Sequence, residues 1–168
     1  GDLFDTARPE PQLLAEVQRI LAPTLGLRVV LLVGNHDQVS DAPGDHALGP
    51  LAPVAEVVER PCVLRCGSRD QGPVDVVCLP YRRGRADDWI PAALREILDG
   101  QGEAGGGSSP FKDRRRRLLA LHCGIRDGET PPWLVDSPDS IHVDVLRAAM
   151  QEYGITAAFA GNWHDARA

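Results

Sequence analysis

The sequence predicts a mixed α/β fold, and two observations carry that prediction. First, runs of branched apolar residues alternate along the chain with segments whose apolar residues recur every three or four positions. These are the patterns of buried strands and of amphipathic helices. Second, Val29 to Val33 are five consecutive branched apolar residues that run into Gly34. Such a run is typical of a strand buried on both faces inside a parallel sheet, and strands that alternate with helices indicate an α/β protein.

The predicted elements follow one another over the whole chain, which we expect to form a single domain spanning residues 1–168. Helices are predicted over residues 11–21, 87–98 and 140–153, the last capped by Asp139 or Ser140, with a short helix around 47–52. Strands are predicted over residues 28–33, 54–58, 62–66, 74–79, 118–123 and 156–160. The Gly- and Ser-rich segment at about 100–110 is predicted to be a flexible surface loop.

The composition is that of an ordinary water-soluble globular protein, with 43% hydrophobic and 25% charged residues. No apolar run approaches the roughly 20 residues that a bilayer crossing needs, and there is no signal-peptide pattern, so no membrane partner is expected. The formal net charge of -6 argues against a generally basic surface that coats nucleic acid. It is compatible with a local basic groove.

The four cysteines are predicted to be buried, reduced thiols of a cytoplasmic protein. Cys62 and Cys66 lie in one predicted strand, where four residues span about 13 Å, too far for a disulfide. The chain contains no Cys-x-x-Cys pair, so a zinc knuckle is not expected.

Three of the predicted strands end at polar side chains that are able to bind a metal ion. These side chains are Asn35, His36, His122, Asn162 and His164. Because ligands bind beyond the carboxyl ends of strands in open α/β sheets, we expect them at one edge of the sheet. Three of the five histidines lie there, which favours a metal site over structural histidines whose hydrogen bonds are satisfied within the fold. For the other two, His46 and His142, a structural role is expected.

These motifs, in their order, resemble those of the calcineurin-like metallophosphoesterases. That family has an Asp-x-His block, then Gly-Asp-x-x-Asp, Gly-Asn-His-Asp or -Glu, a lone histidine, and Gly-His-x-His. The similar segments here are Gly1-Asp2-Leu3-Phe4-Asp5, Gly34-Asn35-His36-Asp37, Leu121-His122-Cys123-Gly124 and Gly161-Asn162-Trp163-His164. The resemblance spans the whole chain and implies a sandwich of α/β/β/α layers.

The sequence departs from the family pattern in two places. The Asp-x-His block is absent, and Asn162 stands where the family usually has histidine. We therefore expect the chain to be a fragment, incomplete at both ends and inactive by itself. An amide oxygen still binds a hard divalent ion, although it binds a transition metal more weakly than imidazole does.

The resemblance implies a dinuclear metal centre. Its ligands would be Asp2, Asn35, His122, Asn162 and His164. The ions implied are two divalent cations, with manganese first and iron, zinc or magnesium as alternatives. His36 would be the acid that protonates the leaving oxygen, or would stabilise charge on the transferring phosphoryl group. Asp37 would orient His36, and Asp5 would support the turn.

The resemblance is strongest to the DNA-repair exonuclease branch, through Val76-Val77-Cys78-Leu79-Pro80-Tyr81-Arg82 and the Gly-Asn-His-Asp segment. It implies a phosphodiesterase acting on nucleic acid, with an ATPase subunit as a further partner. Arg82, Arg83 and Arg85 would contact phosphates, or else form a solvated loop beside Asp87 and Asp88. The basic run 114–117 is expected to be a solvated strand entrance, with phosphate contact as the alternative. The rival functions are a phosphoesterase for small molecules or phosphoproteins, and a non-catalytic scaffold.

Overall fold

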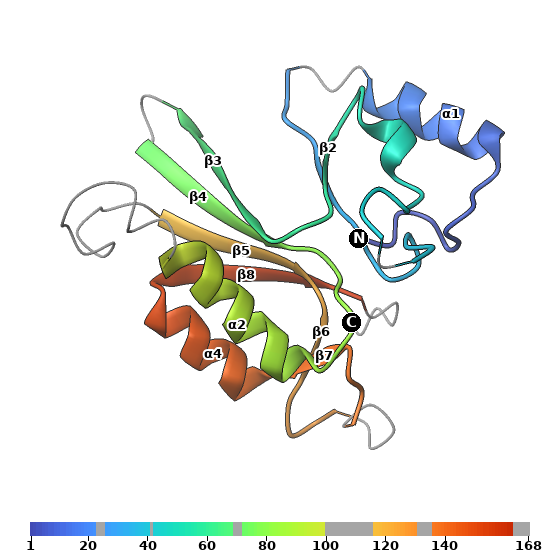
Figure 1. Ribbon diagram of the computed structural model, residues 1–168. Helices are drawn as coiled ribbons and strands as arrows, with labels where there is room; N and C mark the ends of the chain where they lie inside the picture. The colour runs from blue at the N-terminus through green and yellow to red at the C-terminus, as the bar shows by residue number, and fades with distance from the viewer. Residues whose placement is uncertain (23–25, 41, 69–71, 100–115, 131–135, 163–168) are drawn as a thin grey trace. The chain divides into compact units, whose positions relative to one another are not determined.

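The computed structural model describes residues 1–22, 26–40, 42–68, 72–99, 116–130 and 136–162 (Figure 1). The chain divides into two compact units. The first unit consists of residues 1–60 and 80–82, and the second of residues 61–79 and 83–168. The predicted loop at about 100–110 lies outside the described residues, and a single domain over residues 1–168 stays a prediction.

The first unit contains helix α1 (Pro11–Leu21), strand β1 (Val30–Leu32), the 3-10 helix η1 (Gly49–Leu51) and strand β2 (Glu56–Val58). Each element was predicted from the sequence to within two residues. Strands β1 and β2 pair in parallel. The core of the unit consists of Phe4, Val33, Ala47, Leu48 and Leu51. Leu14 and Val17 of α1 pack against this core, whereas Leu13 is 48% exposed.

The prediction that the first strand is buried on both faces was wrong. All three residues of β1 are half-buried, and full burial begins only at Val33, just beyond the strand. The physical reason is that β1 belongs to a two-stranded sheet, in which β2 is its neighbour. A strand with one neighbour leaves part of its surface uncovered, whatever its apolar content.

The second unit is built on a four-stranded mixed sheet of β3 (Cys62–Ser68), β4 (Gly72–Leu79), β5 (Arg116–His122) and β8 (Ile155–Gly161), in that order. Strands β3 and β4 are antiparallel, whereas β5 is parallel to both β4 and β8. Helices α2 (Ala86–Asp99) and α4 (Val143–Glu152) pack on the sheet (Figure 1). This arrangement confirms the predicted mixed α/β fold.

The core of the second unit lies between the helices and one face of the sheet. Successive residues of a strand point to opposite faces, so every second residue of β4 and β5 reaches this core. These residues are Val77, Leu79, Leu119 and Leu121. Helix α2 supplies Trp89, Ile90, Ala93 and Leu94, which the sequence placed on one helical face.

The predicted start of the last helix was wrong. Ser140–His142 forms strand β7, which pairs in parallel with β6 (Gly124–Arg126), and α4 begins at Val143. The N-cap is therefore His142, whose Nδ1 accepts a hydrogen bond from the Asp144 N–H (3.2 Å). Neither Asp139 nor Ser140 caps the helix, because the chain is still extended where the helix was expected to begin.

Among the described residues, none of the helices has the length and the apolar character that a bilayer crossing would require.

Candidate functional site

The turn Gly34–Asp37 follows β1 in the first unit and is closed by the carboxylate of Asp37. This side chain is completely buried. It accepts hydrogen bonds from the backbone N–H groups of Gly34 and Asp2, both at 2.9 Å, and from that of Phe4 at 3.4 Å. A buried carboxylate is stable only when such donors surround it. Asp37 therefore ties the first residues of the chain to the turn after β1.

Asp2 is held directly over this turn. Its Oδ1 accepts a hydrogen bond from the His36 N–H at 2.9 Å. A Cβ atom at Gly34 would lie less than 3.0 Å from the Asp2 side chain, so this position requires glycine. Asp2 itself has a φ of 56°, a left-handed conformation that is uncommon outside glycine, asparagine and aspartate. The two motif segments Gly1–Asp5 and Gly34–Asp37 thus meet in the first unit.

The two supporting carboxylates of this turn have exchanged the roles that were expected for them. The acidic side chain beside the His36 ring is Asp5, with Nδ1 3.6 Å from Oδ1. Asp37 was expected to orient His36, but both of its oxygens accept backbone N–H groups. The Asp37 side chain is buried inside the turn, where it faces backbone N–H groups and not the His36 ring. His36 is half-exposed, and Asn35 lies beside it in the same turn, also half-buried.

Arg82 belongs to the first unit and is exposed. The residue before it, Tyr81, is hydrogen-bonded to the residues that precede and follow the Gly34–Asp37 turn. Its N–H donates to the Val33 carbonyl (2.8 Å), and its own carbonyl accepts from the Gln38 amide (3.4 Å). Arg82 therefore starts from a backbone position fixed beside the Gly34–Asp37 turn. Arg83, which is exposed too, belongs to the second unit.

In the second unit, His122 and Asn162 lie at the carboxyl ends of two adjacent parallel strands. His122 is the last residue of β5, is 1% exposed and is paired with Gly161 of β8. A Cβ atom at Gly161 would come within 3.8 Å of the His122 Nδ1. Asn162 follows directly, so these two predicted ligands share one edge of the sheet. His164 lies outside the described residues.

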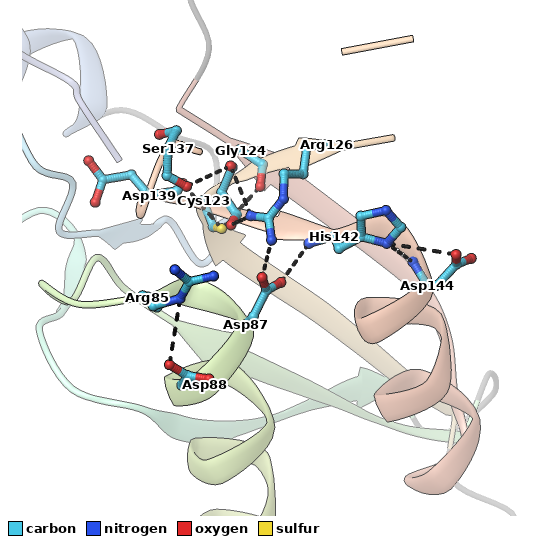
Figure 2. Close-up of polar contacts among 11 residues, drawn as sticks. Arg85, Asp87, Asp88, Cys123, Gly124, Arg126, Ser137, Asp139, His142 and Asp144 are labelled. Carbon is cyan, nitrogen blue, oxygen red and sulfur yellow. Dashed lines mark hydrogen bonds and ion pairs between the residues drawn. The ribbon is translucent and has the colours of Figure 1, made fainter. Parts of the chain in front are cut away.

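The Asn162 side chain is oriented by a backbone carbonyl that sequence reasoning missed. Its amide Nδ2 donates to the Asp139 carbonyl at 3.3 Å. The same carbonyl accepts from the Gly124 N–H (2.9 Å) and from the Cys123 thiol (3.4 Å), as Figure 2 shows for the residues that it labels. Because the carbonyl takes the amide nitrogen, the Asn162 oxygen is the atom left for a ligand. A backbone acceptor has no sequence signal, so only the fold reveals it.

An ion pair between a residue of helix α2 and a residue of strand β6 helps to hold the segment that carries Asp139. The Arg126 guanidinium of β6 contacts the Asp87 carboxylate of α2 and also donates to the Ser140 carbonyl (Figure 2). The second Asp87 oxygen accepts from the His142 N–H at 2.8 Å. Asp87 was expected at the start of a helix, beside a loop of solvated arginines. Its side chain is 18% exposed, and that of Arg126 is 12% exposed.

Burial raises the pKa of Asp87, but the His142 N–H and the Arg126 charge outweigh it and hold the pKa below its ordinary value.

The two described arginines of the basic run 114–117 have different surroundings. Arg117 donates to the Tyr153 carbonyl at 2.8 Å and so helps to hold β5 beside α4. Arg116 is exposed at the start of β5, as the predicted strand entrance requires, and positions 114 and 115 lie outside the described residues. Phosphate contact by Arg117 would therefore cost a structural hydrogen bond.

The donor set suits a divalent cation in its chemistry, since it consists of a carboxylate, amide oxygens and an imidazole. In the first unit Asp2 accepts a hydrogen bond from the turn that contains Asn35, and in the second His122 and Asn162 share one sheet edge. Within the described part of the chain, no three His, Cys, Asp or Glu side chains are grouped closely enough to hold a metal ion.

Comparison with models of protein families and with curated proteins finds no match to this chain.

Proposed function

We propose that this chain is part of a metal-dependent phosphoester hydrolase, with nucleic acid as its substrate. One observation supports this proposal above the others. Two segments more than thirty residues apart lock together through the Asp37 carboxylate on the Asp2 N–H and the Asp2 carboxylate on the His36 N–H. This arrangement presents a carboxylate, an amide and a half-exposed imidazole from one rigid turn, which is what metal-assisted hydrolysis needs.

In this proposal Asp2, Asn35, His122, Asn162 and His164 hold the divalent cations, with manganese as the first candidate. Bound cations would supply an activated water and would neutralise charge on the phosphoryl oxygens. The residues of the chain position these ions: Gly34 leaves room for the Asp2 carboxylate, and the Asp139 carbonyl orients the Asn162 amide.

His36 is the proposed proton donor to the leaving oxygen. Its backbone is fixed by Asp2, while its ring is half-exposed and so is able to reach a substrate. Asp5, 3.6 Å from the ring, replaces Asp37 as the carboxylate that lies beside His36. A positioned general acid contributes about a hundredfold to ten-thousandfold to a rate.

The first prediction separates the roles of the two histidines. Replacing His36 with alanine in the natural protein should lower phosphodiester turnover by about a hundredfold or more, with manganese affinity little changed. His122→Ala should weaken manganese binding, because the imidazole is a proposed ligand. Calorimetric titration with Mn²⁺ measures the affinity, and hydrolysis of a model phosphodiester measures the turnover. A loss of metal in His36→Ala equal to that in His122→Ala would overturn the assignment.

A second prediction tests nucleic acid as the substrate. Arg82 and Arg83 are exposed, so neutralising both should weaken binding to single-stranded DNA and reduce its salt dependence. The slope of log affinity against log salt should fall by about one for each arginine that no longer binds a phosphate. Hydrolysis of a small phosphodiester should change little. Binding is measured by fluorescence anisotropy at several salt concentrations.

The matched control is Arg19→Ala, which removes one positive charge from an exposed ion pair with Glu16 on α1. This variant should bind DNA as the parent chain does. Equal losses on DNA and on the small ester in the Arg82 and Arg83 variants would favour a small-molecule phosphoesterase. No DNA binding by the natural protein would favour the same rival.

A further inference from the structure

Two of the cysteines face each other across the antiparallel pair β3 and β4. In the ladder, Cys62 is the direct partner of Cys78. Directly opposed residues project from the same face of a sheet, with Cα atoms about 4.5 or 5.5 Å apart depending on the hydrogen-bonding pattern. Both separations fall within the range of about 4.4–6.8 Å that a disulfide spans. The strand pairing therefore places these two thiols within bonding reach.

The other two cysteines are not placed for this reaction. Cys66 lies on β3 opposite Val74, and about 13 Å along the strand from Cys62. The Cys123 thiol donates to the carbonyls of Gly124 (3.1 Å) and Asp139 (3.4 Å). Burial raises the pKa of Cys123 to about 12, so it stays a protonated, unreactive thiol at neutral pH.

We propose that Cys62 and Cys78 are a redox-sensitive thiol pair that closes to a cross-strand disulfide when a peroxide is present. All four cysteines are thiols in the structure, and this state is the reduced one. Cys62 is half-buried and Cys78 is 1% exposed, so Cys62 meets the oxidant first. Cys78, the more deeply buried of the two, then acts as the resolving thiol.

The reaction balances with hydrogen peroxide as the oxidant. The Cys62 thiol loses its proton, and the thiolate sulfur attacks one peroxide oxygen. The O–O bond breaks, and the departing hydroxide takes up that proton and leaves as water, which gives a sulfenic acid. The Cys78 sulfur then attacks the Cys62 sulfur, the S–S bond forms, the S–O bond breaks and a second water leaves. Two thiols are oxidised by two electrons, and one peroxide is reduced to two waters. Cys78 gives up its weak hydrogen bond to the Val76 carbonyl (3.8 Å).

The bond should be reversible and should affect one defined segment. Opposed Cβ atoms in a sheet lie about 4.5–5.5 Å apart, somewhat more than the mean of about 3.8 Å in disulfides. The resulting strain makes the bond easier to reduce. Cys62 is the second residue of the segment 61–79 and Cys78 the second to last. The disulfide therefore closes the β3–β4 hairpin where the chain enters and leaves the second unit.

The test oxidises the full chain with hydrogen peroxide, alkylates the remaining thiols and maps the peptides by mass spectrometry. We expect two of the four thiols to be lost, one peptide pair joined through Cys62 and Cys78, and full recovery with dithiothreitol. Cys66 and Cys123 should stay reduced during the oxidation and should therefore be alkylated. A disulfide through Cys66, an intermolecular disulfide, or irreversible oxidation of Cys62 without a crosslink would each overturn the proposal.

The matched control is Cys66→Ser, which lies on the same strand and should leave the crosslink intact. Cys62→Ser and Cys78→Ser should each abolish it. Because the parent chain is mapped directly, the result does not depend on whether these two variants fold. A crosslink of undiminished yield in a folded Cys78→Ser variant would contradict the assignment of the resolving thiol.

Discussion

Replacing Asp37 with alanine should make the amides of Asp2 and Gly34 exchange with solvent about a hundredfold faster, or more. The carboxylate accepts both N–H groups at 2.9 Å and is completely buried. Hydrogen bonds to a charged group contribute about 1.5–3 kcal/mol each, and a buried donor left without an acceptor costs a similar amount. A loss of about 3 kcal/mol corresponds to a change of roughly a hundredfold in the opening equilibrium.

Hydrogen exchange suits this prediction because it reports on single amides of the first unit, whereas all three tryptophans lie within residues 83–168. The control is Asp5→Ala, which removes a carboxylate that is 99% exposed. Exposed ion pairs contribute at most about 1 kcal/mol, so protection of Asp2 and Gly34 should barely change. Equal protection in Asp37→Ala and in the parent chain would show that Asp37 does not hold the motif segments together.

The second large effect is expected at Asp87. Asp87→Asn should lower the free energy of unfolding of the second unit by about 3 kcal/mol, because it leaves the Arg126 charge poorly compensated in a mostly buried position. Urea unfolding followed by tryptophan fluorescence measures the change. The control is Asp88→Asn on the same helical turn, whose side chain is 77% exposed and 3.9 Å from Arg85. We expect a change below about 0.5 kcal/mol there.

The same residue gives the second unit a predictable dependence on pH. Because the pKa of Asp87 is lower in the folded state, its contribution is fully present above the ordinary aspartate pKa of about 3.9. That contribution is lost as the pH falls through the lower, folded value. Asp87→Asn should therefore show a weaker loss of stability than the parent chain on acidification below about pH 4. An unchanged acid transition in the variant would show that the ion pair with Arg126 contributes little.

The elements that the sequence predicted well are those with a strong local pattern. The helix at Ala86–Asp99 has apolar residues at helical spacing, and β4 and β5 are each rich in valine or leucine over seven or eight residues. Their burial follows from their own sequence, because each hides one apolar face. Strands β6 and β7 each contain a single branched apolar residue, Ile125 and Ile141, which is too little to form a pattern, and both strands were therefore missed.

The roles of the charged side chains were harder to predict, because they depend on contacts far apart in the sequence. Nothing near Asp37 indicates that it binds the N–H groups of Asp2 and Phe4, 35 and 33 residues away. The family resemblance instead implied His36 as its partner. The ion pair between Asp87 and Arg126 joins residues 39 apart. Such pairs become visible only when the packing of strands on helices is known.

The most direct test of the proposed metal site is a titration of the isotope-labelled chain with Mn²⁺, followed by amide NMR spectra. Paramagnetic Mn²⁺ removes the signals of nearby amides, so a single site should remove those of residues 34–37 together with those of His122 and Asn162. Ser68 and Gly72 pair at the end of the sheet near Arg116, about 20 Å along β5 from His122, and should keep their signals. Loss at only one of the two predicted groups, or first at the exposed acidic turn 127–129, would contradict a shared metal site.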